Sequence, residues 1–233
     1  KKVDHFFVLR KWEAKYLSGF LHKSHITLQT MGVDFEEFKP IDKNFARGKL
    51  NLPKNKKIIL YVGKFYKLKG VHIIIETFQK LQQKSDDVKL ILVGGSVKDE
   101  LYNEVKSSGA RFYGYMPHNE LPLYFSAADV YLLPAFSYSY AGGIGVAVIE
   151  SLACGIPVVS TTLKDFPTDE WVKLGKIPKD EEDVVRCITD ILENPKPFKN
   201  CREVARKYYD WKNIIHRTIE IYDVLFGGYY RRR

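Results

Sequence analysis

Cysteine is scarce in this chain of 233 residues, and this scarcity argues against two classes of protein. The three cysteines are Cys154, Cys187 and Cys201, an odd number whose spacing matches no metal-binding motif. We therefore expect free thiols in a reducing compartment, in place of a disulfide framework or a zinc site. A chain of this length can bury roughly 70% of its unfolded surface, so a hydrophobic core is enough to stabilise it.

Long apolar runs are missing as well. No stretch reaches the ~18 consecutive apolar residues that a membrane-spanning helix requires. The sequence shows no signal peptide and begins with Lys1 instead of Met, so we expect a fragment of a cytoplasmic protein. Peripheral membrane contact stays an alternative, because the chain ends in three arginines, residues 231–233.

Positive charge is in excess, with a net charge of +9. This excess suits an anionic ligand, an acidic membrane surface or nucleic acid. The basic residues are scattered, and they do not alternate with aromatic residues as RNA-binding motifs require. We therefore expect a mostly solvated basic surface and no nucleic-acid partner.

Charge of either sign is nearly absent from one segment. Between Asp129 and Lys164, Glu150 is the single charged side chain, and it lies in an expected helix among apolar residues. An unpaired carboxylate in such surroundings is costly, so Glu150 should have a ligand or a partner. Two interpretations stay open: the carboxylate binds a pair of ribose hydroxyls, or it caps backbone or pairs with a distant Arg or Lys.

The glycines that precede this helix favour the ligand. Gly142, Gly143 and Gly145 have no side chains to block a close approach. A ligand could therefore reach the backbone N–H groups and the positive dipole end of the helix, where an anion is favoured.

Apolar runs alternate with helical patterns along residues 57–161, which indicates an α/β protein with a parallel sheet and helices on both faces. Strands are expected at residues 57–63, 88–94, 111–115, 129–134 and 157–161, after two short ones at 3–9 and 26–30. Helices are expected at residues 11–22, 71–84, 98–108, 118–128, around Glu150, and at 181–193, 199–209 and 211–226. Asp210 is the expected N-cap of the last helix, and the polar residues 41–56 are typical of a loop.

Ligands of such sheets bind beyond the carboxyl ends of the strands, which selects the loops at residues 63–70, 114–120 and 135–145. The first loop carries Lys64, Lys67 and Lys69 just before a helix. Cations beside a helix N-terminus suit a diphosphate, although Lys67 is expected to be only solvated. The loop lacks the spacing and the Lys-Ser/Thr pair of a P-loop.

Several segments, in this order, resemble the C-terminal, nucleotide-sugar-binding half of a GT-B glycosyltransferase. They are GVDFEEFKP, ILYVGKFYKLKG, KLILVGGS, FYGYM with ELPLYFSAADVYLLPA, and GIGVAVIESLACGIPVVS. The likeness is to the retaining group that includes glycogen and sucrose synthases and mannosyl transferases, and it covers about residues 26–226. It implies a Rossmann-like sheet at residues 41–209, the end of an N-terminal domain with the interdomain segment at 1–40, and a crossover helix with a basic tail at 210–233.

The resemblance also implies roles for single residues. Lys69 matches the lysine on the donor diphosphate, and Lys64 replaces its usual arginine partner, so these two are the expected catalytic residues. Glu150 matches the glutamate that holds the ribose. The full set expected to bind substrate is Gly63, Lys64, Lys69, Met116 (through its backbone, at the base), Gly142, Gly143, Ile144, Gly145 and Glu150. No metal is expected.

One family residue is missing from the pattern. The first glutamate of the family motif, which contacts the donor sugar, falls on Gly142. Tyr138 or Tyr140, in the preceding aromatic loop, is the expected substitute. The histidines, His118 included, are expected to have surface or structural roles.

The expected function is transfer of a sugar from a nucleoside-diphosphate sugar to a saccharide or lipid-linked acceptor. The acceptor would be held by the preceding N-terminal domain, so this chain alone is expected to be inactive. The last helix has too many apolar residues for one stripe, which predicts cover by residues 1–25 or self-association. The alternatives are a nucleotide-sugar-binding module without catalysis and a sugar-nucleotide epimerase of the same fold.

Overall fold

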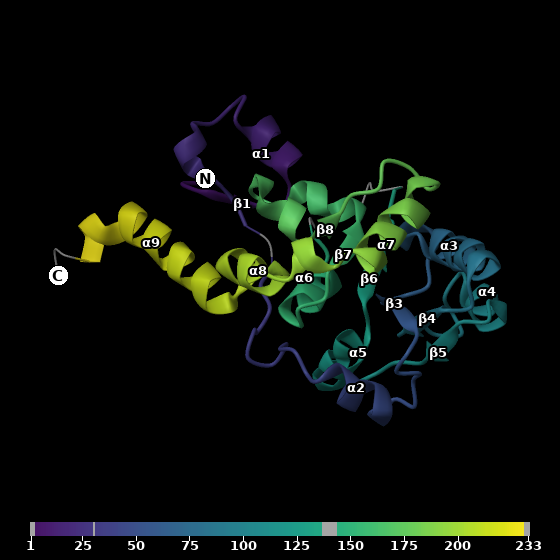
Figure 1. The fold of residues 1–233 in the computed structure, drawn as a ribbon. Coiled ribbons are helices and arrows are strands. Elements are labelled where there is room, and N and C mark those ends of the chain that lie inside the picture. Colours follow the sequence, from purple (N-terminus) through teal and green to yellow (C-terminus); the bar gives the residue numbers. More distant parts are fainter. Residues whose placement is uncertain (1–2, 30, 137–143, 231–233) are drawn as a thin grey trace.

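Six parallel strands form the centre of the computed structural model, which describes residues 3–29, 31–136 and 144–230 (Figure 1). Their order across the sheet is β5-β4-β3-β6-β7-β8. The strands are β3 (Lys57–Val62), β4 (Val88–Val93), β5 (Arg111–Tyr113), β6 (Val130–Leu133), β7 (Val158–Ser160) and β8 (Gly175–Lys176). The central strands are runs of Ile, Leu and Val that are buried on both sides, as a parallel sheet between two helical layers requires.

Helices cover both faces of this sheet (Figure 1). On one face α3 (Val71–Lys84) and α7 (Asp183–Glu193) pack on the strands, and on the other α5 (Leu121–Ala127) and α6 (Val146–Ala153) do so. Behind this second layer, α2 (Lys43–Lys49) packs on α5, and α8 (Cys201–Tyr209) packs on α6. The helix α4 (Tyr102–Ser107) connects β4 to β5. Short 3₁₀ turns lie at Lys23–His25, Lys67–Lys69, His118–Glu120, Thr161–Asp165, Asp169–Lys173 and Lys196–Phe198.

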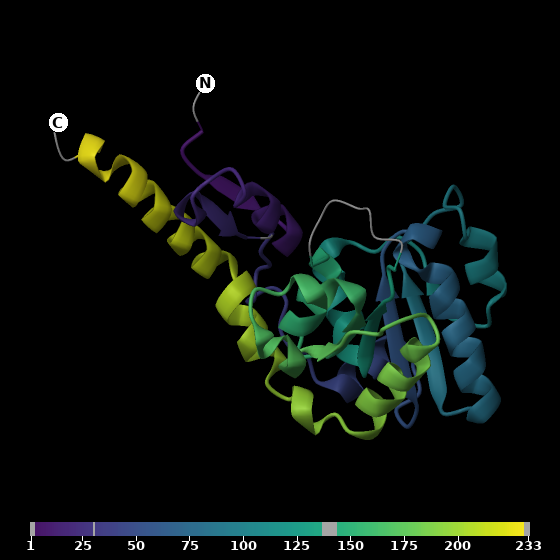
Figure 2. The same ribbon diagram turned by 90° about the horizontal axis from the view of Figure 1, so that it is seen from above.

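A small N-terminal unit lies outside the main sheet. Its strands β1 (Phe6–Val8) and β2 (Ile26–Leu28) pair in parallel, and α1 (Lys11–Leu17) connects them. The long C-terminal helix α9 (Trp211–Tyr230) runs beside this unit (Figure 2), and the side chain of Gln29 donates a hydrogen bond to Thr218 Oγ1 at 3.2 Å. In the part of the chain that the structure describes, no helix combines the length and the apolar character needed to cross a bilayer.

The expected strands from residue 57 to residue 161 are all present, and α3 has its predicted bounds. Asp210 is the N-cap of α9 as predicted, because its carboxylate accepts a hydrogen bond from the Lys212 amide at 3.0 Å. Two expectations need correction. Residues 43–49 form a helix where a loop was expected, since Asp42 caps that segment by accepting from the Phe45 amide at 2.8 Å.

The second correction is β8, which was not expected. A strand of two residues carries no alternation that a sequence pattern can show. Gly175 allows this strand to pair closely with β7, because a Cβ at that position would overlap the backbone of Val158. The helices α1 and α4 are also shorter than expected, because turns occupy residues 18–20 and 97–101.

Candidate functional site

The chain leaves β3 and β6 in opposite directions, although the two strands are neighbours. From β3 it passes through α3 to β4, and from β6 it passes through α6 to β7. The crevice at the carboxyl ends of two such strands is where open α/β sheets bind ligands. Here the loop after β3 lies directly against the end of β6, because a Cβ at Gly70 would overlap the carbonyl group of Pro134. Gly70 has a φ of +74°, which also favours glycine.

The loop at residues 63–70 is fixed from beneath by hydrogen bonds. The hydroxyl of Tyr61 donates to the carbonyl of Lys64 at 2.6 Å, and Asp99 accepts from the amide of Phe65 at 2.8 Å. Lys64 is exposed, and its ammonium lies 5.9 Å from the ring centroid of Tyr66. Lys69 is half-buried, and desolvation lowers the pKa of its ammonium. An anion beside Lys69 would therefore stabilise a charge that the protein alone holds at a cost.

The helix α6 begins next to the end of β6, because a Cβ at Gly145 would contact the side chain of Leu133. Gly145 is its N-cap, with extended backbone, and its carbonyl accepts from the Val148 amide at 3.0 Å. The N–H groups at the start of a helix, before this first bond, have no partner inside the helix, so they are suited to an anion. Ile144 is buried. The sequence predictions for Gly142, Gly143, Tyr138 and Tyr140 concern positions outside the described residues.

Glu150 is the buried charge of α6, with only 5% of its side chain exposed. Its Oε1 accepts a hydrogen bond from Nε2 of His118 at 2.7 Å. Burial raises the pKa of the Glu150 carboxyl, and the hydrogen bond from His118 opposes that rise. The partner is thus a histidine, whereas the sequence pattern indicated backbone, Arg or Lys as partners other than a ligand.

Tyr131 lies near Glu150 and is hydrogen-bonded to the end of β3. Its hydroxyl donates to the carbonyl of Val62 at 3.3 Å, and its ring is fully buried. Burial raises the pKa of Tyr131 well above its usual range, and the nearby charge of Glu150 adds to the rise. Tyr131 therefore stays a neutral donor.

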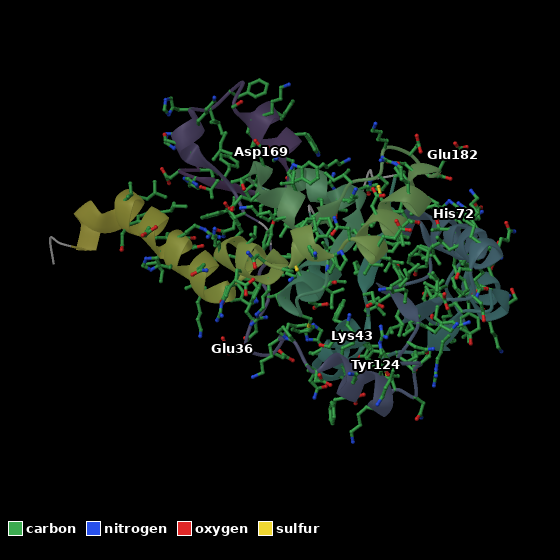
Figure 3. The ribbon with its side chains drawn as sticks, viewed as in Figure 1. Glu36, Lys43, His72, Tyr124, Asp169 and Glu182 are labelled. Atoms are coloured by element: carbon green, nitrogen blue, oxygen red, sulfur yellow. The ribbon has the colours of Figure 1, made fainter. Side chains whose placement is uncertain are left out.

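The loop after β5 brings Met116 toward the same place. The Met116 sulfur accepts a hydrogen bond from the hydroxyl of Tyr124 at 3.0 Å, which fixes the loop two residues before His118 (Tyr124 is labelled in Figure 3). Because His118 contacts Glu150, this loop borders α6. The structure thus joins the Met116 loop to Glu150, and the lysine loop to the end of β6.

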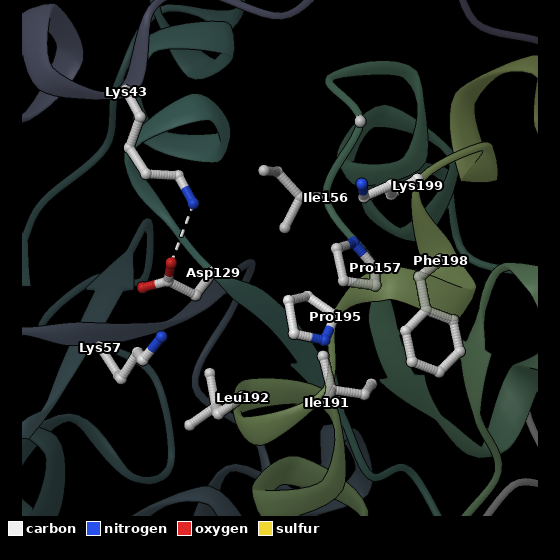
Figure 4. Close-up of a pocket in the computed structure, with 11 residues that line it drawn as sticks. Lys43, Lys57, Asp129, Ile156, Pro157, Ile191, Leu192, Pro195, Phe198 and Lys199 are labelled. Carbon is white, nitrogen blue, oxygen red and sulfur yellow. Dashed lines mark hydrogen bonds and ion pairs between the residues drawn. The ribbon is translucent and has the colours of Figure 1, made fainter.

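A cavity of about 200 Å³ lies away from these loops, at the amino ends of the strands (Figure 4). Its apolar wall includes Ile156, Pro157 and Ile191. At its edge, Lys43 and Asp129 form an ion pair at 2.8 Å. None of the residues predicted to bind substrate lines it.

The comparisons with known proteins identify the family. The model of the family described as "Glycosyl transferases group 1" matches residues 42–208, well over half of the chain. The chain belongs to the group 1 glycosyl transferases. The match spans both loops of the crevice and the whole of α6.

Individual proteins that are similar to this glycosyltransferase domain support the same family assignment. It is 30% identical to a D-inositol 3-phosphate glycosyltransferase of Mycobacterium bovis over 220 residues, which is 87% of this chain and 44% of that protein. The sucrose-phosphate synthase of Thermosynechococcus elongatus has a TM-score of 0.75 and 26% identity, covering 97% of this chain and 59% of that one. HepE of Anabaena, solved with UDP, has a TM-score of 0.75 at 18% identity, covering 95% of this chain and 64% of that one.

These likenesses also define the architecture. The fold is that of the C-terminal domain of the GT-B glycosyltransferases, with the parallel Rossmann-like sheet expected from the sequence. The chain spans about half the length of the curated relatives that it matches.

Proposed function

We propose that this domain binds a nucleoside-diphosphate sugar in the crevice between β3 and β6 and supplies it for retaining sugar transfer. The observation that carries the proposal is Glu150, a buried carboxylate beside the carboxyl edge of the sheet. A carboxylate in this position can accept hydrogen bonds from the hydroxyl groups of a ribose. Burying a charge costs stability, and binding of a ligand gives the protein a reason to bear that cost.

The diphosphate part of the ligand would lie between the lysine loop and α6. Lys69 and Lys64 supply positive charge, and the first turn of α6 supplies N–H donors. In the transfer step, the bond between the anomeric carbon and the diphosphate oxygen breaks, and the diphosphate leaves with the electron pair. The acceptor hydroxyl bonds to the anomeric carbon and gives up its proton, which an oxygen of the leaving diphosphate can accept. Lysine and helix dipole would stabilise the negative charge that develops on the leaving group.

The solved neighbours support a nucleotide of this kind. HepE of Anabaena was crystallised with UDP and with UDP-glucose, and its fold matches this domain. We infer a nucleoside diphosphate as the common part of the ligand, with the base and the sugar left to experiment. The acceptor would be bound by a further domain, because donor and acceptor must be held in reacting geometry across a cleft.

The second candidate is a nucleotide-sugar-binding module without catalysis. The sequence feature that favours it is Gly142, which stands where the family has the glutamate that contacts the donor sugar. The two candidates share the nucleotide site and differ in whether a labelled sugar reaches an acceptor.

Calorimetric titration with UDP, GDP and ADP tests the shared site. Glu150→Gln keeps the size and shape of the side chain, but it replaces one acceptor oxygen with an NH2 donor and removes the charge. We expect it to weaken nucleotide binding about tenfold or more, since hydrogen bonds to a charged group contribute about 1.5–3 kcal/mol. An unchanged affinity in this variant would show that Glu150 is structural and would remove the main support for the proposal.

A further inference from the structure

His118 lies against Glu150 at the surface of the protein. It lies in the turn His118–Glu120, and 61% of its side chain is exposed. Three contacts nevertheless fix its ring: Nε2 is 2.7 Å from Glu150 Oε1, Nδ1 is 3.9 Å from Glu37 Oε1, and the ring packs on Phe38 with centroids 4.9 Å apart. A surface histidine with no role would not need such a fixed orientation.

The residues behind this histidine are also fixed. Phe35 and Phe38 are fully buried, and the guanidinium of Arg202 donates to their carbonyls at 2.7 Å each. The same guanidinium donates to the carbonyl of Ala153, the last residue of α6. The segment that carries Glu37 and Phe38 is therefore attached to the helix that carries Glu150, so the histidine is held between two parts of one rigid frame.

The electrostatic setting of Glu150 explains why a donor is needed. The titratable groups that face it are His118, Glu37, Tyr131 and Cys154, and of these only His118 can provide positive charge. Burial raises the pKa of Glu150, and Glu37 adds to the rise, whereas the hydrogen bond from His118 lowers it. Among the described residues, Nε2 of His118 donates the hydrogen bond to Oε1 of Glu150.

We propose that His118 is a positioning residue for ribose: it holds Oε1 of Glu150 and so presents the rest of the carboxylate to the 2′- and 3′-hydroxyls of a ribonucleotide. This inference rests on the proposed function and adds the histidine to it. A carboxylate has about four acceptor positions, so one imidazole N–H and two hydroxyls fit together. Both the neutral Nε2–H tautomer and the imidazolium can donate this bond.

The pH dependence of binding follows from the same geometry. Ionised Glu150 accepts from both hydroxyls, whereas the protonated acid loses acceptor capacity, so affinity falls as the pH falls through the pKa of Glu150. Because the His118 hydrogen bond lowers that pKa, its removal raises the pKa further. The loss of affinity should then begin at a higher pH in a variant without the histidine.

The test compares UDP with 2′-deoxy-UDP by calorimetry over a series of pH values that runs from acidic to mildly basic. His118→Ala should weaken UDP binding about tenfold at neutral pH and 2′-deoxy-UDP binding less, which reduces the ratio of the two affinities. It should also shift the midpoint of the pH profile upward. His118→Gln should restore much of the UDP affinity, because its amide can donate to Oε1.

Lys69→Ala is the matched control, since it should weaken both nucleotides equally and leave their ratio unchanged. Urea unfolding of each variant checks that the fold is intact. If His118→Ala weakens UDP and 2′-deoxy-UDP equally with no shift of the pH profile, the histidine does not act through the ribose, and the proposed function still stands. If the variant binds UDP more tightly, His118 competes with the ribose and the inference is wrong. If the unaltered chain binds none of UDP, GDP and ADP, both proposals are wrong.

Discussion

Replacing Lys69 with alanine should weaken nucleoside diphosphate binding much more than replacing Lys64. Lys69 is half-buried and burial lowers the pKa of its ammonium, whereas Lys64 is exposed against Tyr66. A hydrogen bond between charged groups at a partly desolvated site contributes about 1.5–3 kcal/mol, and an exposed, screened pair less than about 1 kcal/mol. We therefore expect losses of about 10- to 150-fold for Lys69→Ala and of less than about fivefold for Lys64→Ala.

Calorimetry with UDP and with uridine separates the phosphate contribution from the rest of the ligand. Lys69→Ala should leave the affinity for uridine close to that of the unaltered chain, and Lys69→Arg should keep part of the affinity for UDP. If uridine and UDP lose affinity equally in Lys69→Ala, the lysine does not contact phosphate. If Lys64→Ala has the larger effect, the argument from burial is refuted.

Further predictions concern stability and transfer. Glu150→Gln should keep or raise the urea midpoint at pH values above the pKa of Glu150, because that pKa is raised in the folded state and the ionised carboxylate therefore opposes folding. Asp129→Ala should cost about 3–5 kcal/mol in urea unfolding, because it leaves the buried Arg47 guanidinium without the carboxylate now 2.7 Å away. Lys43→Ala, which removes a half-exposed partner of the same carboxylate, should cost less than about 1 kcal/mol, and equal losses would contradict this assignment. Gly70→Ala should cost more than about 1 kcal/mol, since φ is +74° and the added Cβ meets the end of β6; an unchanged midpoint would show that the loop is not constrained there. Transfer of a labelled sugar should require a longer chain with an acceptor domain, and transfer by this chain alone would contradict that expectation.

The sequence predicted the main sheet well because its signals are local. Residues 57–62 and 88–93 are short apolar runs bounded by charged residues and glycines, and such runs form buried parallel strands. The helix α2 was missed because its stability comes from distant contacts. The buried Arg47 of that helix donates to the carbonyl of Ala127 at 3.0 Å and pairs with Asp129, and neither partner is visible in the local pattern.

In the candidate site, too, contacts between residues far apart in the chain could not be predicted from the local sequence. The isolation of Glu150 in an apolar segment could be seen in the sequence, and so could the lysines after the first long strand. The partner of Glu150 could not, because His118 is 32 residues away and is brought to α6 by the turn before α5. A histidine that follows a proline in a short turn carries no local signal of that pairing. The roles of Gly142 and Gly143 in binding substrate stay predictions from the sequence.

Arg202 has a consequence for exchanging parts between related proteins. The match to the family model begins at residue 42, yet Phe35 and Phe38 complete the core, and a guanidinium from α8 holds their carbonyls. A chimera joined at residue 41 would give the recipient a core with two aromatic side chains missing and an arginine facing unfamiliar carbonyl groups. A graft that starts at residue 32 and includes α8 would transfer Phe35 and Phe38 together with the arginine that binds their carbonyls. The practical border of this module is therefore set by one arginine rather than by the first residue that sequence similarity detects.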